Sequence, residues 1–369
     1  MIASAKKLRD IYERKPYAPF FQREFGFFTL ERWKKEGKID ESTNLDEIFG
    51  FDPPGNYNLC QLGWTLAPFE PCFETKVVED RIDYELVQDE SGRHVLFFKG
   101  RRNGFMPEYI SHPVKDWKTW IENVKWRLDP KTEVRKLQFM NILAALIDAQ
   151  NKGMMITERV IGGYMYLRCL IGPSELPLFF YDHPDIIHDC MKSWFELADA
   201  IIEMHQQYVI IDELYFGEDI CYNHGPLISP RMIKEFLFPY YQQLITNIKS
   251  RQANSGRHLY FHIDTDGYAV SVIPLYKELG MDVMSPFEVA SGCDVVRDGQ
   301  VFPDIAMFGG IDKRILAKTS DDIDRYLDRI LPAMYKRGGY IPTCDHGVPE
   351  EVSFENYMHY RKRVLEYNR

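Results

Sequence analysis

The chain has 369 residues, of which 45% are hydrophobic and 14% aromatic, so it can bury a large core as one sizeable domain or two smaller ones. Its 45 Lys and Arg residues against 55 Asp and Glu give a net charge of -10, and no basic block of the kind that follows phosphates occurs, which argues against a nucleic-acid partner. No apolar window approaches the length of a membrane span and the polar N-terminus has no apolar signal-peptide core, so we expect a cytoplasmic protein without membrane contact. The seven scattered cysteines include no Cys-x-x-Cys pair and predict no disulfide framework.

Residues 1–150 do not alternate strands with helices, and we expect them to form an N-terminal elaboration packed on the main domain. The segment from Lys76 to Gly100 predicts a β-hairpin, because two apolar runs flank the polar turn at 89–92. Two helices are expected at about 116–128 and 132–151, separated by an Asp-Pro pair.

From about Met154 to the C-terminus, short apolar runs alternate with helical patterns, which indicates βαβ units and a parallel sheet. The expected strands are 154–156, 209–211, 258–261, 281–284, 305–308 and 339–341. The expected helices are 185–207, one that starts at Ser229-Pro230, 268–279, 321–336 and 354–367. This repetition predicts an α/β fold, a (β/α)8 TIM-type barrel over residues 151–369, with a doubly wound sheet as the competitor. The absence of a Gly-x-Gly-x-x-Gly or P-loop motif favours the barrel.

Ligand-type side chains follow the predicted strands, at the mouth where a barrel carries its active site. His262 and Asp264 are two residues apart on an extended segment, so both face the same way, and Cys344 follows the last strand. Imidazole, carboxylate and thiolate are the side-chain groups that bind zinc. Taken alone, these residues are a core histidine, a helix cap and a loop thiol, but their joint position predicts a metal site. Glu288 and His346 are further candidate ligands or partners of the ligands.

Two more pairs of residues follow predicted strands. Glu218 and Asp219 either solvate a loop or handle a proton or substrate. Gly309 and Gly310 form either a plain turn or a place where a bulky cofactor approaches the backbone.

Several segments from Met154 onward resemble the uroporphyrinogen decarboxylase superfamily, and within it the corrinoid-dependent methyltransferases. These segments, in consistent order, are Gly217-Glu218-Asp219, Gly225-Pro226-Leu227-Ile228-Ser229-Pro230, Phe261-His262-Ile263-Asp264, Gly280-Met281-Asp282, Pro286-Phe287-Glu288, Phe308-Gly309-Gly310-Ile311-Asp312 and Gly338-Gly339-Tyr340-Ile341. The resemblance implies a TIM-type barrel. The arginine-rich N-terminal run of the decarboxylases has only Arg23 and Arg32 as its counterpart here, which disfavours porphyrinogen decarboxylation.

The methyltransferase branch is similar in its zinc-binding His-x-Cys and later Cys. By this resemblance His262, Cys344 and Glu288 correspond to zinc ligands, and Asp264 stands where the first cysteine would be. A carboxylate in place of a thiolate leaves a harder ion, suited to polarising an ether oxygen rather than holding a thiolate. The chain contains no recognisable corrinoid-binding domain, so the resemblance implies a corrinoid protein as partner.

The resulting hypothesis is a zinc-dependent enzyme that moves a methyl group between a small O-methyl or N-methyl molecule and the corrinoid of a partner protein. Glu218, Asp219 or His346 would supply the proton to the leaving group. Two alternatives stay open: a metal-independent decarboxylase acting on a small acid, which requires a cationic mouth, and a non-catalytic scaffold, which requires a blocked mouth.

Overall fold

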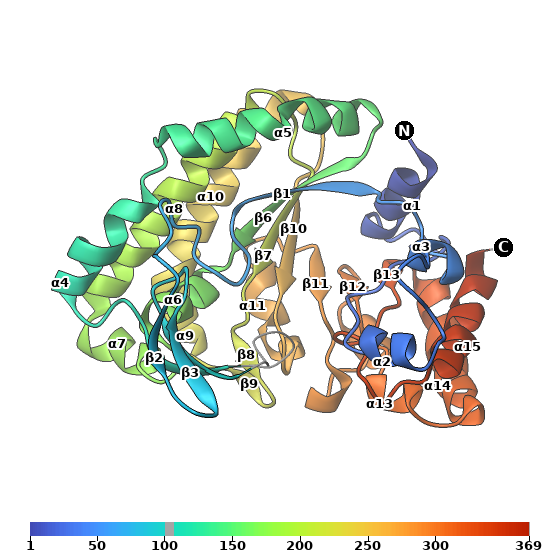
Figure 1. Cartoon of the computed structure of the whole chain (residues 1–369). Helices are drawn as coiled ribbons and strands as arrows, with labels where there is room; N and C mark the ends of the chain where they lie inside the picture. The colour runs from blue at the N-terminus through green and yellow to red at the C-terminus, as the bar shows by residue number, and fades with distance from the viewer. Residues whose placement is uncertain (100–106, 369) are drawn as a thin grey trace.

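The structure is a computed structural model that describes residues 1–99 and 107–368. Its centre is a parallel sheet of seven strands in the order β1-β6-β7-β10-β11-β12-β13 (Figure 1). The strands are β1 Asn56–Leu62, β6 Met155–Ile161, β7 Glu213–Gly217, β10 Tyr260–Asp264, β11 Val283–Ser285, β12 Ala306–Phe308 and β13 Tyr340–Ile341. Because neighbours in the sheet are neighbours in sequence order and run parallel, each connection is a βαβ-type crossover. The predicted α/β class is confirmed.

The sheet has two edges, β1 and β13, and no ladder joins them in the part of the chain that the structure describes. Closure into an eight-stranded barrel therefore stays a prediction. The N-terminal segment lies at this opening, because Phe21 belongs to the same apolar cluster as Met155 of β6 and Ile341 of β13. A single bridge between Phe27 and Val348 ties the segment to the chain beyond β13.

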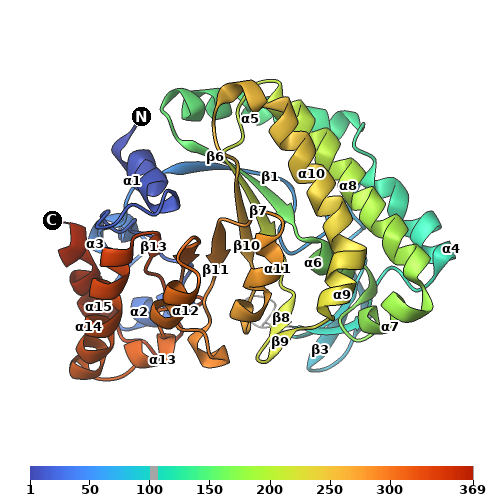
Figure 2. The ribbon, with the colours of Figure 1, turned by 180° about the vertical axis from the view of Figure 1, so that it is seen from behind.

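Helices cover the outer face of the sheet (Figures 1 and 2). The α-helices of the described residues are α1 Ala3–Tyr12, α2 Leu30–Lys35, α3 Leu45–Ile48, α4 Trp117–Thr119, α5 Glu133–Asn151, α6 Gly163–Ile171, α7 Leu176–Asp182, α8 Pro184–Gln206, α9 Pro230–Met232, α10 Phe238–Arg251, α11 Ile273–Lys277, α12 Val295–Val301, α13 Lys313–Leu316, α14 Ser320–Arg337 and α15 Phe354–Leu365. Helices α5, α8 and α10 lie beside β1 to β10, and α12 to α15 lie beside β11 to β13. No helix within the described ranges is long and apolar enough to cross a membrane.

The local sequence explains how the α9–α10 region starts and why it is irregular. The Ser229 hydroxyl accepts the Met232 N–H as an N-cap, and Pro230 occupies the first turn. A π-helical turn, Ile233–Leu237, then precedes α10, whose first turn contains Pro239. Proline has no N–H to complete the α-helical ladder, which accounts for the irregular turn before Pro239.

The main sheet begins earlier than predicted, inside the stretch assigned to the N-terminal elaboration. Strand β1 pairs in parallel with β6, with Asn58 opposite Thr157 and Leu59 opposite Glu158. Polar Asn56 and Asn58 alternate with apolar neighbours, as an edge strand lining a polar cavity requires. Strand β1 therefore belongs to the main sheet, in addition to residues 151–369, which were expected to form its main part.

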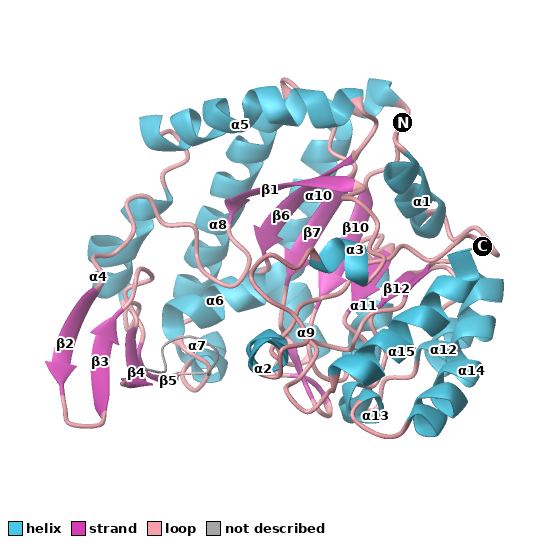
Figure 3. Ribbon diagram, turned by 45° about the vertical axis from the view of Figure 1, so that its right-hand side comes forward, coloured by secondary structure: helices cyan, strands magenta, loops and turns pink. Residues whose placement is uncertain are grey.

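What remains of the elaboration is a four-stranded antiparallel sheet at the edge of the molecule, beside α4 and α7 (Figure 3). Its strands are β2 Lys76–Asp80, β3 Tyr84–Gln88, β4 His94–Phe98 and β5 Glu108–Ser111. The predicted hairpin is confirmed as β3–β4, and two further strands flank it. Its predicted end at Gly100 lies outside the described residues. A short ribbon, β8 Cys221–Tyr222 with β9 Gly225–Pro226, lies near the ends of the central strands.

One predicted strand is shifted, and the shift changes the position of two acids. The apolar run 209–211 precedes the strand, and β7 begins at Glu213. Asp212 and Glu213 therefore lie at the start of β7 rather than after its end. Glu158, which follows the expected strand 154–156 and would then lie at the mouth, is inside β6, and its carboxylate is 2.7 Å from His205 Nδ1 of α8, behind the sheet.

Asp212 joins the N-terminal ends of the strands to α1. Its fully buried carboxylate accepts from Arg9 at 3.1 and 3.2 Å, from Arg257 at 2.6 Å and from the Ile156 N–H at 2.9 Å. The carboxylate thus connects α1, β6 and the segment before β10, and it keeps two cations paired at the base of the sheet.

We expect Asp212→Ala to lower the free energy of unfolding by about 3 kcal/mol, because it leaves two arginines without their partner and a buried N–H without its acceptor. Urea unfolding followed by circular dichroism measures the change. The control is Asp304→Ala, which removes an exposed ion pair with Lys277 and should cost less than about 1 kcal/mol. Equal effects of the two variants would contradict this role for Asp212.

Candidate active site

A cavity of about 320 Å³ lies on the inner face of the sheet. Alternate residues of each strand face it, as the two-residue period of a strand requires. The strands contribute Thr157 and Arg159 from β6, Glu213 and Tyr215 from β7, His262 and Asp264 from β10, and Ser285 from β11. The N-terminal region contributes Tyr12, Arg23, Glu24, Phe25 and Trp64. The predicted pair His262 and Asp264 therefore faces one shared space.

Glu213 is the polar hub at the base of the cavity. Its carboxylate accepts from the Tyr12 hydroxyl at 2.5 Å and from the Thr157 hydroxyl at 2.6 Å, and it lies 2.8 Å from His262 Nδ1. Burial would raise the pKa of Glu213, but the hydrogen bonds from His262, Thr157 and Tyr12 outweigh it and lower this pKa below its usual value. The carboxylate is therefore ionised, and His262 carries a proton on Nδ1.

A second set of bonds leads from His262 to Asp264. His262 Nε2 is 2.8 Å from the Ser285 hydroxyl, which donates to Asp264 Oδ2 at 2.8 Å, and the Tyr215 hydroxyl donates to the same oxygen. Ser285 has one proton, so both of its contacts are hydrogen bonds only when His262 Nε2 also carries a proton. The arrangement therefore forms a continuous path for a proton from His262 Nε2 through Ser285 to Asp264.

Arg159 lines the cavity from β6, two strands away from His262. Its guanidinium carbon lies 5.2 Å from the ring centroid of Trp64 and 5.2 Å from that of Tyr215, so the cation lies over two aromatic rings. Its Nε is buried without a hydrogen-bond partner, and no carboxylate within the described ranges pairs with it. Arg23, the other cavity arginine, is paired with Asp46 at 3.1 Å.

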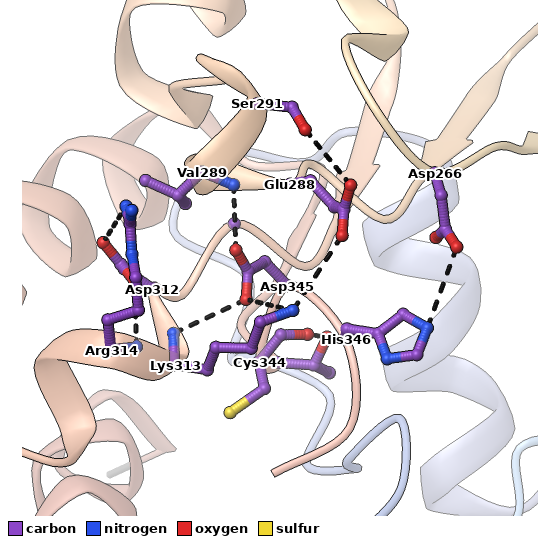
Figure 4. Close-up of polar contacts among 12 residues, drawn as sticks. Asp266, Glu288, Val289, Ser291, Asp312, Lys313, Arg314, Cys344, Asp345 and His346 are labelled. Atoms are coloured by element: carbon purple, nitrogen blue, oxygen red, sulfur yellow. Dashed lines mark hydrogen bonds and ion pairs between the residues drawn. The ribbon is translucent and has the colours of Figure 1, made fainter. Parts of the chain in front are cut away.

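The structure does not bring the predicted metal ligands together. Of the four, only His262 and Asp264 line the cavity. Glu288 accepts from the Gly267 N–H at 2.7 Å and lies 3.9 Å from Lys313. Cys344 is fully buried, and Figure 4 shows its sulfur pointing away from Glu288 and from His346, the further candidate ligand.

The side chains as arranged do not fit a zinc ion. No group of three His, Cys, Asp or Glu side chains among the described residues is placed to hold a metal. Both nitrogens of His262 are engaged by Glu213 and Ser285, and Asp264 Oδ2 already accepts two hydroxyls. Burial also raises the pKa of the Cys344 thiol well above its usual value, which disfavours the thiolate that a metal requires.

The other predicted mouth residues are found at a second, smaller cavity. About 230 Å³ in volume, it is lined by Asp219, Asp264, Asp266 and His346, so Asp264 borders both spaces. Burial, followed by the charges of Asp219, Asp264 and Glu288, raises the pKa of Asp266 to about 7. His346 Nε2 lies 3.8 Å from Asp266, and Asp219 is bound to Arg168 at 2.5 Å. This part of the mouth is acidic.

Glu218 lies behind the sheet rather than in either cavity. Its carboxylate accepts from the Tyr241 hydroxyl at 2.7 and 2.9 Å and from the Tyr164 N–H at 3.1 Å. Burial raises its pKa to about 7. The contacts explain this residue as a buried link between β7 and the helices α6 and α10.

Gly309 and Gly310 also have packing explanations. Both have positive φ angles, and a Cβ at Gly309 would lie 3.1 Å from the Phe287 nitrogen. A Cβ at Gly310 would lie 2.3 Å from a Val295 methyl. These glycines let the chain after β12 pass close to α12 and to the chain after β11. Neither glycine lines the main cavity or the second, smaller one.

Glu213 was expected at the mouth, after the apolar run 209–211, but three other cavity residues, Arg159, Tyr215 and Ser285, were not assigned to the site from the sequence. They lie within strands, whereas the prediction considered only residues after strands. A usable signal was present: Thr157 and Arg159, like Glu213 and Tyr215, are polar residues two apart inside apolar strands, which marks an inner polar face.

Comparison with known proteins places the chain in a family. The family model described as "Uroporphyrinogen decarboxylase (URO-D)" matches residues 113–367. No curated protein matches the chain significantly. Among solved structures, a "methyltransferase from Methanosarcina mazei" is similar over 100% of both chains, with 12% sequence identity and a TM-score of 0.61. A B12-independent methionine synthase from Shewanella sp. W3-18-1 covers 61% of this chain and 64% of its own, with 13% identity and a TM-score of 0.36.

Since the family model covers more than half of the chain, the protein belongs to the uroporphyrinogen decarboxylase family. The Methanosarcina structure, at 12% identity, shows the shared fold.

If Cys344 is a zinc ligand, its substitution should lower the zinc content of the protein; if it is a core residue, the zinc content should not change. We expect Cys344→Ala to retain the zinc content of wild-type protein, because the thiol does not face His262. Metal analysis of protein purified without a His-tag measures this, with His262→Ala as the comparison. Zinc present in wild type and lost in both variants would show that the mouth rearranges into the ligand set predicted from the sequence.

The raised pKa of Glu218 predicts a pH dependence of stability. Between its ordinary value near 4.5 and its folded value of about 7, the folded protein binds more protons than the unfolded chain, so stability falls as pH rises. The loss is on the order of 3 kcal/mol across this window.

We therefore expect Glu218→Gln, compared with wild type, to lose less stability between about pH 5 and about pH 8. Urea midpoints at the two pH values measure the difference. The control is Glu196→Gln, at an exposed position near Lys192, which should leave the pH dependence of wild type unchanged. An identical pH dependence of stability in Glu218→Gln and wild type would contradict the raised pKa of Glu218.

Proposed function

We propose that the protein is a methyltransferase that moves a methyl group between a small O-methyl or N-methyl molecule in the cavity and a corrinoid held by a partner protein. The observation that carries the proposal is the pair His262 and Asp264 on one face of β10, linked by Ser285 inside a cavity of the family fold. The fold that the chain shares with the Methanosarcina methyltransferase supports this choice within the family.

The size of the cavity supports a small substrate. Small-molecule pockets run from about 300 to 1,000 Å³, and the cavity of 320 Å³ lies at the lower end of that range. A porphyrinogen, a ring of four pyrroles with several acidic side chains, needs more space and more cations than Arg23 and Arg159 provide. This favours methyl transfer over porphyrinogen decarboxylation.

The chemistry that this chain would contribute is proton transfer. When the methyl group leaves an ether, the C–O bond breaks, its electron pair stays on the oxygen, and this oxygen must take up a proton. The corrinoid, when bound, would supply the nucleophile that takes the methyl carbon. Asp264 would receive a proton from His262 through the Ser285 hydroxyl and pass it to the oxygen.

No step is assigned to zinc, because the ligand set does not fit one as arranged. Zinc remains a proposal that the metal analysis above tests. Glu288 and Cys344 are accordingly given no part in the reaction. Asp219 and His346 line the neighbouring cavity, where a docked partner would approach Asp264.

A second candidate function, decarboxylation of a small acid without a metal, is favoured by one observation. Arg159 is an unpaired cation inside the cavity, as a carboxylate substrate requires. The two functions differ in their products: decarboxylation releases CO₂ without a corrinoid, whereas methyl transfer alkylates cob(I)alamin and releases no gas.

We expect Ser285→Ala to lower the rate of methyl transfer to free cob(I)alamin by about 100-fold, because the proton path from His262 to Asp264 is cut. The assay follows the loss of cob(I)alamin absorbance with methoxybenzenes and methylated amines as donors. The control is Ser291→Ala, which removes a hydroxyl bound to Glu288 outside the main cavity. Equal rates for the two variants would show that the proton path through Ser285 takes no part in the reaction. Release of CO₂ without alkylation of cob(I)alamin would favour the second function.

A further inference from the structure

We propose that Arg159 is the substrate-anchoring residue of the cavity and that the substrate is a small carboxylate. The proposal deepens the function given above and rests on it for taking this cavity as the substrate site and for the methyl group of the substrate. Its basis is the placement of one unpaired cation within a set of groups that are otherwise paired.

Arg159 differs from the other charged groups of the cavity in that it has no partner among the described residues. Glu213 and Asp264 each accept several hydrogen bonds within the cavity, and Arg23 has Asp46 as its partner. Arg159 has no carboxylate or hydrogen-bond acceptor in the described parts of the chain. A half-buried guanidinium without an anion is costly, and one with a bound carboxylate gains two parallel charge-assisted hydrogen bonds.

Two aromatic rings restrict the orientation of the Arg159 guanidinium. Trp64 and Tyr215 lie at 5.2 Å from it and restrict its position. Gly217 makes room for Trp64, since a Cβ at Gly217 would lie 2.3 Å from the Trp64 Cδ1 atom. A planar cation held between rings is preorganised, so little conformational entropy is lost when a carboxylate binds.

Arg159 lies two strands away from the groups that we propose to take part in the reaction. In the sheet register Arg159 is opposite Tyr215, and Tyr215 is opposite His262. The three residues therefore lie side by side, with roughly 10 Å between the first and last Cα atoms, two strand spacings. A single-ring carboxylate gripped by Arg159 would place its far end beside Asp264 and Ser285, where the methyl-bearing oxygen must lie.

The lining of the cavity favours a flat, aromatic substrate. Besides Trp64 and Tyr215, the cavity is lined by Phe25 and Phe308. Aromatic walls on a space of 320 Å³ suit a flat ring. A methoxylated aromatic carboxylate matches the cation, the span and the walls together.

The test is calorimetric titration with 4-methoxybenzoate and with its neutral isostere 4-methoxybenzamide, without any corrinoid. We expect wild-type protein to bind the carboxylate at least about tenfold more tightly than the amide. Arg159→Gln should abolish this preference, and the control Arg23→Gln should retain it. Gly217→Ala, which displaces Trp64 but keeps the charge, should weaken carboxylate binding. Thermal melting checks that all three variants fold.

Several results would overturn the proposal. They are equal affinity for carboxylate and amide, a preference that survives Arg159→Gln, no binding of either probe at millimolar concentration, and displacement of 4-methoxybenzoate by inorganic phosphate at equal concentration. Because binding is measured without methyl transfer, failure of the proposed function leaves this test intact. A carboxylate site in a protein that does not alkylate cob(I)alamin would retain Arg159 as the anchor and remove the reaction.

Discussion

The cavity depends on one buried carboxylate. Glu213 accepts hydrogen bonds from α1 through Tyr12, from β6 through Thr157 and from β10 through His262. Three donors hold it ionised although it is buried, and the ionised group in turn fixes the ring and the proton position of His262. Without this hub the inner face of the sheet would carry a histidine of undefined orientation, and the path to Asp264 would have no defined start.

Much of the fold could be predicted because its signals are local. Alternating apolar runs and amphipathic helices, such as α8 at Pro184–Gln206, require only periodicity. Strand β1 could not be found this way, since an edge strand that lines a polar cavity alternates Asn56 and Asn58 with apolar residues and contains no β-branched run. The shift of β7 arose because the run 209–211 is as apolar as a strand, although the hydrogen bonds of the sheet begin at Glu213.

The site was predicted in part, and the division has a physical reason. His262 and Asp264 share a face because of strand geometry alone, so their proximity follows from sequence spacing. The position of Cys344 depends on long-range packing: its N–H binds Glu24 at 2.8 Å, from the far end of the chain, and its thiol is buried in the core. No local pattern records such a contact. The same is true of Arg159, whose importance lies in the absence of a partner within the described structure.

These differences change the meaning of Asp264. Read against thiol-using relatives, an aspartate in place of a cysteine suggests a harder metal ligand. In the structure the carboxylate accepts hydrogens from Tyr215 and Ser285 and borders both cavities, which is the position of a proton carrier between a histidine and a bound molecule. A thiol could not hold two such donors at one atom as well as a carboxylate oxygen does. A substrate that spans Arg159 and Asp264, as we propose, would have its charged end and its reacting end fixed at once.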